Sequence, residues 1–436
     1  MKQNKYAFSL FVIGTLFFVF GFITWINGIL MPFLKASCEL TTFQASFVPF
    51  AFYISYFFMA IPSSFLIKKI GYSGGMMIGL LTMAIGAVLF IPAAAMRQFP
   101  LFLTGLFIQG AGLTLLQAAS NPYATILGPI ETAARRISIM GVCNKLAGII
   151  GFYTLYKALF SGMQNELKNV ESGLLTGAER EATLQHLSEQ VILPYIVITA
   201  VFILLVVFIK LAKLPKVETP EQEQDGQARS LFSYPYLWLG VFAIFFYVGA
   251  EVIAIDYLIP YGKSLHMADS VTKNFPMYAL FALIVGYFLG LLTVPKMISQ
   301  RQALVVHLMI AMLLTGVAVC SLTLVAFFQP SLSPMDSMAM ASKLSIACII
   351  MLSFAHAIMW PAIWPLSIHD LGRHTEMAGG LLVMACAGGG VMSLVYGKLC
   401  DIPAIGHRTA YCLLFVSYLY ILFFATYGYK MTGKKK

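Results

Sequence analysis

Charged residues are scarce in this sequence. Asp, Glu, Lys and Arg together make up 11% of its 436 residues, whereas a typical soluble domain carries about 25%. A chain of this length with so few charges cannot cover a water-facing surface, which argues against a soluble enzyme. The net charge of +10 comes from basic residues spread over many loops. Because nucleic-acid binding needs a clustered basic face, we expect no nucleic-acid partner.

Ligand motifs are also missing. The seven cysteines form no Cys-x-x-Cys pair and no Cys/His spacing, and most lie in apolar runs. We interpret them as small packing residues, and we expect neither a metal site nor a disulfide framework. The glycine-rich stretches "GAGLTLLQ" and "AGGGV" lack nucleotide-binding spacing and suit close helix packing. The sequence therefore predicts no bound cofactor.

Long hydrophobic runs dominate instead. Hydrophobic residues make up 59% of the chain, and the mean hydropathy is +0.84. A helix that spans a bilayer needs about 20 mostly apolar residues. The first run is too long for a signal peptide and has no cleavage site. We predict twelve spans, at 6–31, 43–66, 76–96, 100–127, 137–160, 191–212, 236–261, 274–295, 303–328, 344–368, 377–397 and 409–429.

A polar segment divides these spans into two sets of six. It contains "PKVETPEQEQDGQARS" and covers 213–235, so we predict a cytoplasmic linker between halves at 1–212 and 236–436. Lys and Arg concentrate in the loops on the N-terminal side of the membrane, and the positive-inside rule then places both termini in the cytoplasm. The predicted fold is an all-α membrane protein with two pseudo-symmetric halves.

Three charged residues fall inside predicted spans. Lys145 interrupts "GVCNKLAGIIG", and Glu251 and Asp256 lie in "FYVGAEVIAIDYLIP". A charge in hydrocarbon is costly and marks a candidate functional site. The two acids are five positions apart, so on a helix their side chains point about 140° apart. We therefore expect that they do not share one site. Glu251 is the deeper acid, and Asp256 is expected to line an aqueous vestibule; a fixed ion pair that only stabilises packing is the alternative.

Uncharged polar and aromatic residues cluster in the same spans. Amides both donate to and accept from hydroxyls, and flat aromatic rings can cover the C–H face of a sugar. Trp360 and Trp364 are four residues apart and share a helix face with His356. Each amide could instead bond a neighbouring helix, and the histidine could be a packing residue. The candidate sugar-binding residues are Trp25, Asn27, Gln117, Asn121, Asn144, Lys145, Glu251, His356, Trp360 and Trp364.

Four stretches resemble the fucose–galactose–glucose:proton symporter family of the major facilitator superfamily. They are "GFITWINGILMPFLK", "LLQAASNPYATILGP", "YVGAEV" and "PAIWPLSIHDLGRHTEMAGGLLVMACAGGG". The resemblance implies alternating access, a hexose site between the halves, a monomer, and a location in the bacterial inner membrane.

The departures from that family concern its ionisable residues. Relatives have an aspartate where this chain has Gly28, and fucose symporters have a glutamate where it has Gln117. Glutamine at the second position resembles the glucose/galactose members, as does Glu251. Asn144 matches a family asparagine, whereas Lys145 replaces a serine-like residue. The acids of the relatives are thus absent at Gly28 and Gln117, and the candidate coupling residues are Lys145, Glu251 and Asp256.

These observations predict a secondary transporter that imports a glucose- or galactose-like hexose with protons. We expect Lys145 and Glu251 to form a charge pair at the sugar site, and proton uptake on one of them to bias the alternation. The expected partners are a monosaccharide and the lipid bilayer. Alternatives are sodium-coupled or uncoupled carriage of the same sugars, a drug exporter on the same fold, and a sensor or membrane enzyme.

Overall fold

The computed structural model describes residues 2–126, 133–160, 169–170, 174–215, 231–294, 297–369, 371 and 375–431. The chain separates into two compact units, Met1–Pro220 and Glu221–Lys436. The division falls in the predicted linker 213–235, of which 216–230 lie outside the described residues. The domain boundaries themselves stay a prediction.

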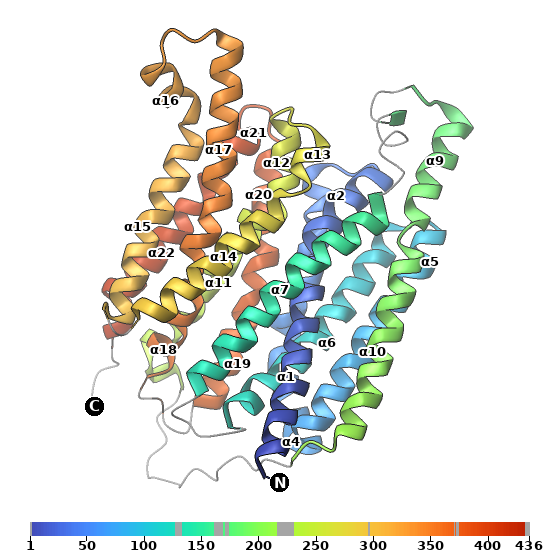
Figure 1. Ribbon diagram of the computed structural model, residues 1–436, viewed down its shortest axis with the longest axis vertical. Coiled ribbons are helices and arrows are strands. Elements are labelled where there is room, and N and C mark those ends of the chain that lie inside the picture. The colour runs from blue at the N-terminus through green and yellow to red at the C-terminus, as the bar shows by residue number, and fades with distance from the viewer. Residues whose placement is uncertain are drawn as a thin grey trace. The chain divides into compact units, whose positions relative to one another are not determined.

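The regular elements described in the first unit are all α-helices, drawn in blue to green in Figure 1. Its helices are α1 (Lys2–Trp25), α2 (Asn27–Ser37), α3 (Thr42–Ala45), α4 (Phe47–Val88), α5 (Phe90–Ala95), α6 (Phe99–Ile126), α7 (Ala133–Phe160), α9 (Gly177–Glu189) and α10 (Ile192–Ala212).

The second unit consists of α-helices and short 3₁₀ turns (Figure 1, yellow-green to red). Its elements are η2 (Leu231–Ser233), α11 (Pro235–Asp256), α12 (Leu258–Ser264), α13 (Asp269–Thr272), α14 (Phe275–Thr293), α15 (Gln300–Val319), α16 (Ser321–Phe328), α17 (Pro334–His356), α18 (Met359–Ile368), α19 (Thr375–Met384), η4 (Ala385–Ala387), α20 (Gly388–Cys400), α21 (Gly406–Ala410), α22 (Leu413–Thr426) and η5 (Gly428–Lys430).

The twelve predicted spans are present. Eleven helical stretches of the described residues are long and apolar enough to cross a membrane. One of them, Thr42–Ala95, contains two predicted spans, because α4 is interrupted at Gly71. Gly71 has a φ of 76°, a left-handed conformation that glycine adopts without steric cost. The turn lies in "FLIKKIGYSGG", between predicted spans two and three.

Two helices extend beyond the prediction. Residues 161–190 were expected to form a loop, but α9 occupies Gly177–Glu189. Its Leu184 and Leu187 are buried against Ala36 and Val170, so tertiary packing stabilises a helix whose sequence is mostly polar. In the other unit, α17 begins at Pro334, ten residues before the predicted span, because Ser333 caps it by accepting from the Asp336 backbone amide.

Several predicted spans are interrupted in their interior, for example the ninth between α15 and α16. Three of the interruptions matter for the site: the first span breaks between α1 and α2, the seventh between α11 and α12, and the tenth between α17 and α18. Membrane transporters commonly build substrate sites from discontinuous helices, whose freed backbone groups and re-aimed side chains line a cavity. Candidate residues from the sequence lie at each of these breaks, which directs attention to them.

Candidate functional site

The break in the first span carries two candidate residues. Trp25 ends α1 and Asn27 begins α2, with Ile26 between them. Trp25 is 3% exposed and Asn27 is 1% exposed. The side-chain amide nitrogen of Asn27 has no hydrogen-bond partner among the described residues. A buried donor without a partner is costly, so this nitrogen is suited to a ligand's acceptor.

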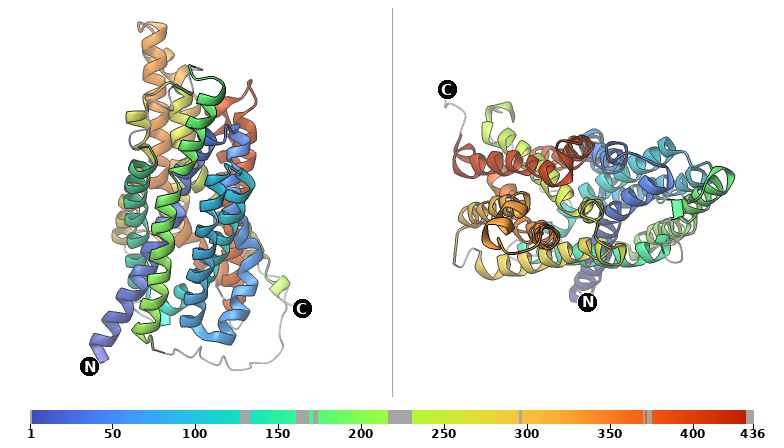
Figure 2. Two further views of the ribbon diagram at one scale, coloured as in Figure 1. Left: turned by 90° about the vertical axis from the view of Figure 1, so that its right-hand side faces the viewer. Right: turned by 90° about the horizontal axis from the view of Figure 1, so that it is seen from above.

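The α7 helix brings Asn144 and Lys145 to Trp25. The indole nitrogen of Trp25 donates to the Asn144 side-chain oxygen over 3.2 Å, and the Lys145 ammonium lies 4.2 Å from the centroid of the Trp25 ring. The latter is a cation–π contact. Figures 1 and 2 show α1 and α7 side by side within the first unit. Three sequence candidates therefore form one cluster.

Gly21 makes this cluster possible. A Cβ atom placed on Gly21 would lie 1.8 Å from the backbone oxygen of Asn144, so α1 and α7 touch backbone to backbone there. Small residues allow membrane helices to approach this closely. The close approach sets Asn144 and Lys145 within reach of the next turn of α1, where Trp25 lies.

The other candidates of the first unit lie on α6. Gln117 and Asn121 are half-buried and one turn apart. They share a helix face, as a pair of sugar-binding amides would. Their role stays a prediction.

In the second unit, α11 carries both acids. Glu251 is 8% exposed and Asp256, the last residue of α11, is 2% exposed. The Glu251 carboxylate forms a side-chain hydrogen bond with the Tyr247 hydroxyl, one turn earlier. It also interacts electrostatically with Tyr287 of α14. The burial of Asp256 differs from the expected position in an aqueous vestibule, because α11 packs against its neighbours up to its last turn.

Tyr247 also joins Glu251 to the tryptophans of the tenth span. The Tyr247 and Trp360 rings are 6.2 Å apart between centroids, and Trp360 lies 5.3 Å from Trp364. Tyr247 and Tyr287 are not among the candidate residues predicted from the sequence. Tyr247 could have been found from "YVGAE", since a residue four before a buried acid shares its helix face.

His356 occupies a different kind of position from the tryptophans. It is fully buried, and its Nε2 atom is 2.9 Å from the Tyr418 hydroxyl of α22. Its Nδ1 atom has no partner among the described residues. His356 is the last residue of α17, whereas Trp360 and Trp364 lie on α18. The single stripe expected from the sequence is therefore interrupted by the break at Ala357 and Ile358.

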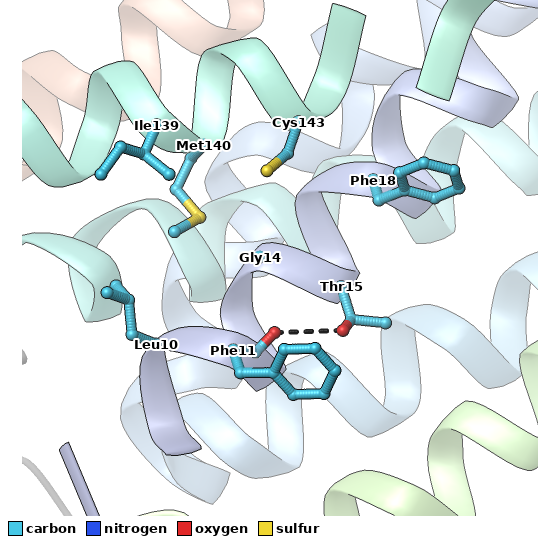
Figure 3. Close-up of a pocket in the computed structure, with 8 residues that line it drawn as sticks. All are labelled: Leu10, Phe11, Gly14, Thr15, Phe18, Ile139, Met140 and Cys143. Carbon is cyan, nitrogen blue, oxygen red and sulfur yellow. Dashed lines mark hydrogen bonds between the residues drawn. The ribbon is translucent and has the colours of Figure 1, made fainter. Parts of the chain in front are cut away.

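An apolar cavity of about 470 Å³ lies elsewhere, between α1 and α7. Figure 3 shows its lining, in which the Thr15 hydroxyl donates to the Phe11 backbone oxygen and is thereby occupied. Phe11 is 65% exposed, as expected of a side chain that faces lipid. None of the candidate residues lines this cavity, and its apolar walls do not suit a polyol.

The two clusters offer a consistent chemistry. Each combines aromatic rings with amide, hydroxyl or carboxylate groups on helices that are interrupted nearby. Such sites can hold a small polar molecule through hydrogen bonds while covering its apolar face. The pairing of Lys145 with Glu251 joins residues of separate units and stays a prediction.

Comparisons with known proteins agree with this chemistry. Residues 13–394 match the model of the Major Facilitator Superfamily. The chain is 32% identical to a glucose/galactose transporter of Brucella abortus, over 98% of this chain and 96% of that protein. It is 29% identical to the L-fucose-proton symporter of Escherichia coli, over 92% and 88% of the two chains.

The fold agrees as well. A crystal structure of the Escherichia coli fucose:proton symporter superposes with a TM-score of 0.70, covering 97% of this chain and 99% of that one at 26% identity. The D-xylose-proton symporter shares the fold with a TM-score of 0.67 at 14% identity. The chain is a multi-pass membrane protein and belongs to the Major Facilitator Superfamily.

Proposed function

We propose that this protein imports a hexose of the glucose/galactose class by alternating access, coupled to protons. The observation that carries the proposal is the cluster of Trp25, Asn144 and Lys145. It places an indole face, an amide and a cation together at a break in the first span, and sugar hydroxyls can both donate to and accept from such groups. The names of the relatives support the same substrate class.

Proton coupling is the finer part of the proposal. Glu251 is a carboxylate inside a span, surrounded by Tyr247 and Tyr287, and Lys145 is a cation inside another span. A coupling ion acts only by binding one conformational state better than the other. Protonation of Glu251 or deprotonation of Lys145 would supply that difference. The relative from Escherichia coli is named a proton symporter, which supports protons over sodium.

Counterflow in proteoliposomes tests the proposal. Purified protein is loaded with unlabelled sugar, and entry of labelled glucose, galactose and fucose is followed at two pH values with and without sodium. We expect glucose or galactose to exchange, and uptake to follow a pH gradient in sodium-free buffer. Trp25→Phe should weaken exchange, whereas Trp238→Phe, on α11 and stacked on Phe232, is the matched control.

Other outcomes point to other functions. Uptake that requires sodium or ignores both gradients would replace proton symport by the sodium-coupled or uncoupled carrier. If none of the three sugars exchanges and the protein instead drives efflux of lipophilic cations, it is a drug exporter and the proposal is overturned.

A further inference from the structure

The break in the tenth span has a cause in the sequence. The segment "MWPAIWP" contains Pro361 and Pro365. Proline lacks the backbone N–H that bonds the carbonyl four residues earlier, and its ring clashes with that carbonyl. Pro361 thus disrupts the helix at Ala357, where the chain leaves α17, and Pro365 leaves the Pro361 carbonyl without its usual donor.

Two side chains of α15 bind the carbonyls at this break. His307 Nδ1 is 3.1 Å from the backbone oxygen of Ala355, in the last turn of α17. Because a carbonyl oxygen only accepts, Nδ1 is the donor. The Gln300 side-chain nitrogen donates to the backbone oxygen of Pro361 on α18. His307 and Gln300 therefore supply donors to one carbonyl on each side of the break.

The spacing of these two side chains matches the break. They are seven residues apart on α15, which places them on one face and about 10 Å apart along the helix axis. Their acceptors, Ala355 and Pro361, run in the opposite direction along the broken span. The His307 ring also stacks on Phe354, with ring centroids 5.6 Å apart. Side chains of α15 thus bind both α17 and α18, the two segments of the broken span.

The α14 helix also contacts the break in the tenth span. A Cβ atom on Gly286 would lie 2.7 Å from the backbone oxygen of Phe354 and 2.6 Å from the Cβ of Ala357. A Cβ atom on Gly290 would lie 2.2 Å from the end of the Ile358 side chain. The backbone of α14 therefore packs directly against the residues at the break.

We propose that His307 and Gln300 are positioning residues for substrate binding, because they hold the two sides of the break and so set where Trp360 and Trp364 stand. Both tryptophans lie on α18, and Trp360 directly precedes Pro361, whose carbonyl Gln300 binds. Neither positioning residue is a candidate for sugar contact. This inference rests on the proposed sugar transport and names residues that affect the affinity for sugar.

The test compares His307→Leu, Gln300→Leu and His307→Asn in sugar counterflow with the full-length protein. Removing one donor should raise the KM for sugar about three- to tenfold, with the maximal rate within about twofold. His307→Asn keeps a side-chain N–H and should restore part of the affinity. Val306→Leu changes the exposed neighbour of His307 and should leave KM unchanged.

A double-mutant cycle separates positioning from general packing. In a Trp360→Phe background, His307→Leu should lose most of its effect on KM, because the residue it positions has already changed. An equal effect in both backgrounds would overturn the inference. Should His307→Leu fail to fold, Gln300→Leu, at the first turn of α15, answers the same question in the same cycle.

A spectroscopic measurement decides the inference even if the sugar proposal fails. The chain has four tryptophans, so a variant with Trp25→Phe and Trp238→Phe reports only Trp360 and Trp364. In that background His307→Leu should shift the emission maximum without sugar, and Val306→Leu should not. Absence of a shift would contradict the positioning role, whereas absence of counterflow in the wild type would contradict only the proposed function.

Discussion

The Lys145 ammonium lies 4.2 Å from the centre of the Trp25 ring, and this contact explains how a lysine is tolerated inside a predicted span. The ring quadrupole attracts the cation, and the indole nitrogen of the same ring donates to Asn144. Trp25 therefore connects the charged residue of α7 to its neutral neighbour. Several expected outcomes depend on this arrangement.

Removing the amide should weaken sugar binding. Asn144→Ala deletes the acceptor of the Trp25 indole nitrogen, and the loss of a hydrogen bond from a binding site costs about 1 kcal/mol. We expect the KM of counterflow to rise roughly fivefold, at an unchanged amount of folded protein. Asn274→Ala, at the start of α14, is the matched control. A KM within error of the wild type would remove Asn144 from the site.

Neutralising the charges inside the spans should change the pH dependence of uptake. Lys145→Ala and Glu251→Gln each remove a group whose protonation could differ between the two conformational states. We expect either variant to reduce accumulation driven by a pH gradient while leaving counterflow measurable. Lys157→Ala removes the exposed lysine in the last turn of the same α7 helix.

The Lys157→Ala control shows whether the pH dependence of uptake changes with the loss of any lysine from α7 or only with the loss of Lys145. Lys157→Ala should retain the pH dependence of the wild type. If Lys145→Ala and Glu251→Gln also retain it, neither residue couples protons to transport, and the coupling hypothesis fails.

The sequence was sufficient for the spans but not for the geometry within them. Long apolar runs predict where helices cross, because the bilayer dictates their length, and the turn at Gly71 lies in the gap between two predicted spans. The α9 helix was missed, since its only apolar anchors, Leu184 and Leu187, act through packing on residues distant in the chain. Local pattern carries no information about such contacts.

Several residues of the candidate site could be predicted from the sequence, but the contacts between them could not. Lys145 is conspicuous as a charge in an apolar run, and Trp25 belongs to a polar cluster in the first span. That these two residues meet depends on Gly21, whose missing side chain lets α1 and α7 touch. His307 and Gln300 were not predicted. Pro365 leaves the Pro361 carbonyl without its usual donor, which could have indicated Gln300, but nothing in "MWPAIWP" indicates the bond from His307 to Ala355.

Leu184→Ala and Glu39→Gln should differ strongly in their effect on stability. Leu184 is fully buried, and truncating a buried leucine costs about 2–5 kcal/mol. Glu39 forms surface ion pairs with Arg97 and Arg180, which are worth about 0–1 kcal/mol. Thermal unfolding in detergent should therefore show a clear loss for the leucine variant and a small one for the glutamate variant. Comparable losses would show that the ion pairs contribute as much to the docking of α9 as the buried leucine does.

Fusion reporters should place both termini in the cytoplasm. The Lys and Arg residues concentrate in segments on the N-terminal side of the membrane, and the positive-inside rule orients the chain accordingly. A C-terminal green fluorescent protein should fluoresce, and a C-terminal alkaline phosphatase should be inactive. Phosphatase fused after Leu332, between α16 and α17, is the opposite control and should be active. Reversed results at both positions would invert the topology.

Gly21→Ala should destabilise the first unit more than Gly14→Ala does. Both glycines lie on α1, but a Cβ atom at Gly21 would be 1.8 Å from the Asn144 backbone oxygen, whereas the nearest atom at Gly14 is the end of the Met140 side chain, 3.8 Å away. Forcing an extra methyl group into a close contact costs about 1–3 kcal/mol. We expect a lower midpoint of thermal unfolding for Gly21→Ala, with weaker sugar binding as Asn144 moves away from Trp25. Gly14→Ala should match the wild type in both measurements, and equal midpoints for the two variants would show that α1 and α7 do not need backbone contact.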